Sequence, residues 1–123
     1  MLAKANRIVS ATDYRRLVRS GRRARGALTL AYGRRSNPES PLRVGVIVAR
    51  NVGNAVVRNR VRRRIKAVGW AVAHEVHGLD VVVRALPSAA AADFAAIDGE
   101  VRRLVGVLQE LSLIHISEPT RPY

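Results

Sequence analysis

Three stretches of the chain carry the apolar pattern of β-strands. Residues 27–32 alternate apolar with other side chains. Residues 42–49 are apolar at most positions, so we expect a strand that is buried on much of both faces. Residues 79–86 have three consecutive valines at their centre and form the third predicted strand.

Apolar residues at helical spacing are found before, between and after these strands. A short helix is expected to follow Ser10, which can cap it, and to end at Gly21. A long helix is expected to begin with Asn54 as its N-cap, and its apolar residues fall within about 80° of one another. These residues are Val57, Val61, Ile65, Val68 and Val72. A last helix carries its apolar residues from Phe94 to Leu108.

The order of these elements, α-β-β-α-β-α, predicts an α+β fold, an α/β sandwich in which helices pack on one small sheet. A further short strand would fit this order. The strands on either side of the long helix should run parallel, because the helix joins them as a crossover. We expect residues 1–111 to form a single domain. Residues 112–123 contain two prolines and lack the helical period, so we interpret them as a tail foreign to the natural protein, with a native extension as the alternative.

Positive charge is concentrated in the first half of the chain. The net charge of the 123 residues is +13, but residues 1–66 carry 18 basic and two acidic residues, whereas residues 67–123 carry four basic and seven acidic ones. Residues 50–66 hold seven basic residues and no acid. Almost all of the basic residues are arginines, whose planar fork of donors matches phosphate geometry. This distribution predicts a polyanionic partner, nucleic acid above all.

The long predicted helix separates its apolar and basic residues onto two faces. Opposite the apolar stripe lie Arg58, Asn59, Arg62, Arg63 and Lys66, while Arg60 and Arg64 flank it. The helix N-terminus near Asn54 adds unpaired N–H groups that attract phosphate. A basic face that is merely solvated is the alternative. Seven like charges without an interleaved acid repel one another, however, and this favours an external anion.

Several other classes of protein are not supported by the sequence. The chain has no cysteine, which excludes disulfides and thiolate metal sites. No apolar run approaches the ~20 residues of a membrane span and no signal peptide is evident, so we expect a cytoplasmic protein without a membrane partner. A two-metal nuclease needs converging carboxylates, and the basic half contains only Asp13 and Glu39. No loop for a small-molecule phosphate substrate is present, and we predict no catalytic residue and no metal ligand.

The aromatic residues divide into two pairs. Tyr14 and Tyr32 could stack on unpaired bases, or they could simply pack between the first helix and the sheet. Trp70 and Phe94 lie on or near predicted helices, and we expect both in the core.

The run Gly-Asn-Ala-Val-Val-Arg-Asn-Arg at residues 53–60 resembles the signature of the bacterial ribonuclease P protein component. The resemblance covers about residues 1–110. It includes Asn6-Arg7, Asp13-Tyr14, Gly21, Arg43-Val44-Gly45 and Gly78-Leu79-Asp80. One departure is Ala49-Arg50-Asn51, where the family usually has a Ser-Lys-Lys-like string, so Arg50 keeps one charge and Asn51 loses the other.

The resemblance implies the protein subunit of a ribonucleoprotein endonuclease that removes the 5′ leader of precursor tRNA. It implies that a catalytic RNA carries the chemistry, with Mg²⁺ bound mainly through RNA. It also implies a left-handed β-α-β crossover. The residues implied to bind RNA are Arg7, Arg50, Asn54, Arg58, Asn59, Arg60, Arg62, Arg63 and Lys66. Those implied to line a cleft for the leader are Tyr14, Val18 and Tyr32. The alternatives are a ribosomal or nucleoid protein that uses the same basic face and, with less support, a metal-dependent nuclease.

Overall fold

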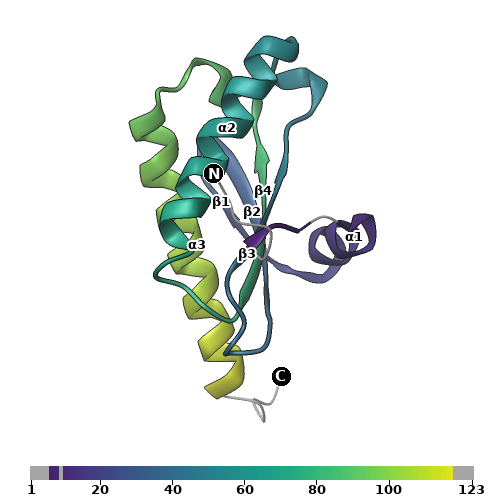
Figure 1. The fold of residues 1–123 in the computed structure, drawn as a ribbon, viewed down its shortest axis with the longest axis vertical. Coiled ribbons are helices and arrows are strands. Elements are labelled where there is room, and N and C mark those ends of the chain that lie inside the picture. Colours follow the sequence, from purple (N-terminus) through teal and green to yellow (C-terminus); the bar gives the residue numbers. More distant parts are fainter. Residues whose placement is uncertain (1–5, 9, 118–123) are drawn as a thin grey trace.

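One four-stranded sheet with helices on both faces makes up the protein (Figure 1). The computed structural model describes residues 6–8 and 10–117, the last six of them as helix backbone only. Helix α1 covers one face of the sheet, and α2 and α3 lie side by side on the other. The helices are α1 (Ala11–Ser20), α2 (Ala55–Val72) and α3 (Phe94–Ser117), and the strands are β1 (Arg22–Arg25), β2 (Thr29–Arg35), β3 (Arg43–Ile47) and β4 (Leu79–Ala85).

The strands lie in the order β1-β2-β4-β3. β2 pairs antiparallel with both β1 and β4, whereas β3 and β4 are parallel neighbours joined through α2. The predicted α+β fold and the parallel crossover are therefore confirmed.

The short strand β1 completes the sheet at the edge beside β2. Only Ala24 of its four residues is buried, and the three arginines are exposed. A segment with a single small apolar residue shows no alternation of apolar and polar positions, so its sequence does not predict a strand. Its pairing with β2 makes it one.

Helix α3 continues farther than its apolar pattern indicated. The helix was expected to stop before residue 112, but its backbone is helical to Ser117, so that boundary was wrong. No glycine or proline occurs between Val107 and Glu118, and without such a residue nothing stops the helix before Pro119. The remainder of the predicted tail, 118–123, lies outside the described residues.

Two hydrophobic clusters hold the helices to the sheet. The larger one packs the apolar faces of α2 and α3 on the sheet, and Val61, Ile65, Val68 and Val72 of the predicted stripe are buried in it. The smaller one, beneath α1, consists of Ile8, Leu17, Tyr32 and Val82.

Trp70 and Phe94, which were expected in the core, are instead 39% and 43% exposed. At ~100° per residue Trp70 lies about 180° from the centre of the α2 stripe. Phe94 is the first residue of α3, where a side chain that points toward the N-terminus projects past the helix. Both expectations were wrong for these geometric reasons.

Glu100 of α3 joins that helix to the β1–β2 hairpin. Its carboxylate accepts hydrogen bonds from Leu28 N–H at 3.0 Å and from the hydroxyl of the fully buried Thr29 at 2.6 Å. Glu100→Ala leaves these donors without an acceptor, which is expected to lower the free energy of unfolding by about 2 kcal/mol. Urea denaturation measures the change. Glu110→Ala, at an exposed position of the same helix, is the control, and an equal loss in both variants would contradict the interpretation.

Candidate nucleic-acid interface

The chain turns sharply from β3 into α2, and local contacts fix that turn. A short 3-10 helix (Arg50–Val52) follows β3 and places Arg50 on the surface just before α2. A Cβ on Gly53 would lie 2.8 Å from Val57 Cγ1, so the close approach requires glycine. The Oδ1 atom of Asn54 accepts the Val57 N–H at 3.0 Å, which confirms Asn54 as the N-cap.

The outer face of α2, defined here as Arg58, Asn59, Arg62, Arg63 and Lys66, carries positive charge that no acid neutralises. In the part of the chain that the structure describes, no ion pair involves a basic residue of α2. Arg62 donates to Asn59 Oδ1 at 2.8 Å, one turn away, and Arg63 is exposed. A rigid helix thus presents cationic groups at helical spacing, as binding to a phosphate backbone requires.

The two flanking arginines of α2 bind the protein itself. Arg60 donates to Ala90 O at 3.2 Å and Arg64 donates to Ala92 O at 2.7 Å. These carbonyls lie in and directly after the 3-10 helix that precedes α3 (Pro87–Ala91). Arg64 is therefore a structural residue. Arg60 already uses one donor inside the protein, and its RNA contact stays a prediction.

Arg7 lies away from α2, on the segment that runs beside β3. Ile8 N–H donates to Val44 O at 3.1 Å, and Asn6 Nδ2 donates to Leu42 O at 2.8 Å. These bonds fix the segment along β3 and leave the Arg7 side chain exposed.

Tyr14 of α1 lies against the backbone of β3. A Cβ on Gly45 would be 2.6 Å from Tyr14 Cζ, so the ring approaches the strand only because residue 45 is glycine. The Tyr14 hydroxyl accepts a hydrogen bond from Val46 N–H at 3.1 Å. Helix α1 is thereby held at a set distance above the sheet.

A hollow of about 340 Å³ opens where α1 meets the sheet. Tyr14, Val18 and Ile47 give it apolar walls, and Arg15 and Arg19 stand beside them. Two of the three residues predicted for the cleft therefore line it. The third, Tyr32, is only 5% exposed and packs in the smaller cluster, so the packing alternative applies to Tyr32 and it cannot stack on a base.

The open part of the same sheet face is basic. Directly paired residues of neighbouring strands share a face, and the register puts Arg23 opposite Tyr32, Arg25 opposite Leu30, and Arg84 opposite Leu30 and Ile47. All three arginines are exposed. None of these arginines was predicted, because only the strand register places them on this face. Ile47, Arg15 and Arg19, which line the hollow, were not predicted either: packing of α1 on β3 brings them together.

Arg43, the first residue of β3, connects α1 to the sheet. It donates to Asp80 through Nε at 3.0 Å and Nη2 at 2.7 Å, and its Nη1 lies 3.5 Å from an oxygen of Asp13 in α1. The hydrogen bonds to Asp80, with the charges of Asp80 and Asp13, raise the pKa of Arg43 above its ordinary value despite partial desolvation. The guanidinium therefore stays charged, and its contacts with Asp80 and Asp13 fasten α1 to the sheet.

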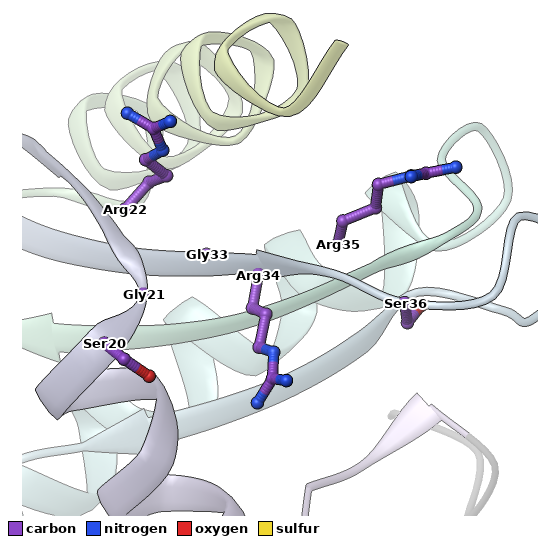
Figure 2. Close-up of a pocket in the computed structure, with 7 residues that line it drawn as sticks. All are labelled: Ser20, Gly21, Arg22, Gly33, Arg34, Arg35 and Ser36. Atoms are coloured by element: carbon purple, nitrogen blue, oxygen red, sulfur yellow. The ribbon is translucent and has the colours of Figure 1, made fainter. Parts of the chain in front are cut away.

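A larger hollow, of about 470 Å³, lies at the end of β2 (Figure 2). Figure 2 shows that Arg22 and Arg35 point to the face that carries α3, whereas Arg34 points to the opposite face, where α1 lies. The three guanidinium groups do not converge on one anion. Arg34 instead extends the basic surface beside α1.

Comparison with known proteins agrees with this geometry. The family model for ribonuclease P matches residues 2–109. The ribonuclease P protein component of Acidothermus cellulolyticus is 40% identical over 112 residues, which cover 89% of this chain and 93% of the relative. That of Clavibacter michiganensis is 44% identical over 88 residues, or 71% of this chain and 78% of the relative.

Solved structures of bacterial RNase P proteins have the same fold. The Staphylococcus aureus protein superposes with a TM-score of 0.74 at 25% identity, covering 85% of this chain and 95% of that one. The Thermotoga maritima protein, at 19% identity, superposes with a TM-score of 0.67 over 80% of this chain and 93% of that one. The chain therefore belongs to the family of ribonuclease P protein components, the protein subunit of the enzyme that processes the 5′ end of tRNA.

Proposed function

We propose that the outer face of α2 binds a catalytic RNA and that the hollow beside α1 holds the single-stranded 5′ leader of precursor tRNA, in the cytoplasm. The observation that carries the proposal is the set of cations on α2 that no described carboxylate neutralises. The two surfaces lie on opposite faces of the sheet, so one molecule can contact both RNAs at once. Arg7 and Arg50 would add contacts at the β3 edge and at the start of α2.

The hollow suits a single strand better than a duplex. Its apolar walls, Tyr14, Val18 and Ile47, can contact the faces of unpaired bases, and the surrounding arginines can pair with the phosphates. Neither kind of contact reads base edges, so we expect leader binding to depend on length and charge more than on sequence.

Magnesium is the metal that such an enzyme would use, and the described residues group no ligands for it. Mg²⁺ takes oxygen ligands in near-octahedral geometry. Within residues 6–8 and 10–117, no three side chains of His, Asp or Glu are grouped to hold a metal, and Asp13 and Asp80 face Arg43. We therefore propose that the metal ions are bound mainly through RNA.

The same described residues contain no helix that is long and apolar enough to cross a membrane.

Reconstitution tests the proposed function. Cognate catalytic RNA is mixed with a precursor tRNA bearing a leader, at physiological magnesium, with and without the protein. The protein is expected to speed leader removal and to raise affinity for the precursor over leaderless tRNA, while protein alone cleaves nothing. Unchanged cleavage by the RNA would refute the proposal. Recovery of the protein with ribosomal RNA or bulk DNA instead of one discrete RNA would favour the ribosomal or nucleoid alternative.

A further inference from the structure

Trp70 is the only tryptophan of the chain and is 39% exposed on α2. At ~100° per residue it falls in line with Asn59, Arg63 and Lys66, at the centre of the basic side of the helix. Burying an indole removes a large apolar area from water and normally stabilises a fold. Here the indole lies outside the core and among polar and basic groups.

The surroundings of Trp70 leave part of its ring accessible, and one other ring contacts it. The ring of His74, in the turn after α2, meets the indole edge to face with centroids 4.9 Å apart and an interplanar angle of 83°. A single ring contact covers at most one face of the indole. The helix neighbours three residues away, Ala67 and Ala73, carry only methyl groups and cannot screen it.

The charge around Trp70 favours a negatively charged partner. No acid occurs from residue 50 to residue 74. The next acid, Glu75, lies 3.7 Å from Arg102 of α3. Trp70 is seven residues beyond Arg63, or about 10 Å along the helix, so a single strand bound to the cations reaches it within a few nucleotides.

We propose that Trp70 stacks on an unpaired nucleotide of the same RNA that binds the outer face of α2, and so extends this interface by one helical turn beyond Lys66. The inference rests on the proposed function. It follows from the combination found in binders of single-stranded nucleic acid, in which cations follow the phosphates and aromatic rings accept the bases. It also accounts for an exposed indole that the core does not use.

The single tryptophan makes the test direct. Catalytic RNA is titrated into the wild-type protein, and Trp70 emission is expected to be quenched and to become protected from acrylamide. Trp70→Leu keeps an apolar side chain but removes the aromatic ring, and it is expected to weaken RNA binding roughly 5- to 150-fold. Trp70→Phe, which keeps a ring, is expected to bind with intermediate affinity. Circular dichroism and thermal unfolding establish that each variant is folded.

Salt dependence separates stacking from a loss of charge or of helix structure. Trp70→Leu is expected to leave the slope of log affinity against log salt unchanged, because stacking releases no counterions. Arg62→Ala, the matched variant on the same face, is expected to lower that slope by roughly 0.7–0.9.

Three results would overturn the inference. In the first, Trp70→Leu binds as tightly as wild type while Arg62→Ala is weakened. In the second, Trp70 emission and acrylamide access are unchanged in the complex. In the third, Trp70→Leu abolishes a self-association that RNA does not affect, which would assign the ring to a protein contact. Failure of the wild-type protein to bind the RNA at all would refute the proposed function, and this inference with it.

Discussion

Replacing Arg58, Arg62, Arg63 and Lys66 together by alanine is expected to weaken binding to the catalytic RNA roughly a thousandfold at 0.1 M salt. Each phosphate contact contributes roughly 0.7–0.9 to the slope of log affinity against log salt, so loss of four contacts should lower the slope by about three. Folding should survive, because Arg63 is exposed and Arg58, Arg62 and Lys66 are only partly buried, outside the buried stripe of α2. Filter binding between about 0.1 and 1 M salt measures both quantities.

Two single variants control for the general effect of charge. Arg64→Ala removes a charge from the same helix, but its guanidinium donates to Ala92 O. Arg103→Ala removes an exposed charge from α3. Each variant should leave the slope of log affinity against log salt essentially unchanged. Each should reduce affinity only slightly, because salt screens the long-range attraction of one charge. If the fourfold variant kept the wild-type slope, or if Arg103→Ala lowered it equally, α2 would not be the docking face.

The architecture of α2 could be predicted from the sequence because its signals are local and periodic. The apolar stripe that includes Val61 and Ile65, the cap at Asn54 and the acid-free run of arginines all lie within one element. The same periodicity places Trp70 on the basic side of the helix, about 180° from the centre of the apolar stripe. Its exposure could therefore also have been predicted from the sequence. For Trp70, position on the helix decides burial and hydrophobicity does not.

The cleft could be predicted only in part, because it is built from pairings between distant strands. Tyr14 and Val18 lie on one helix and were found from it. The position of Arg84 beside Ile47 depends on the register of β4 with β3, and that of Arg23 beside Tyr32 on the register of β1 with β2, and the sequence displays neither. Burial of Tyr32 similarly depends on Leu17 and Val82 closing over it. Alternation shows which residues share a face of a strand, but not which element covers that face.

Gly45→Ala is expected to disrupt the hollow proposed to hold the leader while leaving the proposed α2 interface intact. The added Cβ would lie 2.6 Å from Tyr14 Cζ and 2.7 Å from the Tyr14 hydroxyl oxygen. The ring must therefore swing away from β3 and give up the hydrogen bond from Val46 N–H. Overpacking of this kind costs about 1–3 kcal/mol, and the lost hydrogen bond adds about 0.5–1.5 kcal/mol. We expect the free energy of unfolding to fall by about 2–4 kcal/mol.

The functional consequence should be selective, because α1 and α2 lie on opposite faces of the sheet. With α1 displaced, the preference of the assembled enzyme for leader-bearing precursor over leaderless tRNA should be lost, whereas affinity for the catalytic RNA should remain. Equilibrium binding of the two tRNAs to the reconstituted enzyme measures the preference, at a temperature where the variant is folded.

Gly33→Ala, on β2 two strands away from β3, provides the matched control. Its Cβ would meet Leu108 of α3 at 3.0–3.2 Å, so it strains the opposite face of the sheet and should lower stability without changing leader preference.

Tyr14→Phe removes only the acceptor for Val46 N–H and should give a smaller loss of stability, about 1 kcal/mol. If Gly33→Ala abolished leader preference as fully as Gly45→Ala, the effect would reflect general destabilisation, and the position of Tyr14 against Gly45 would have no special part in holding the leader.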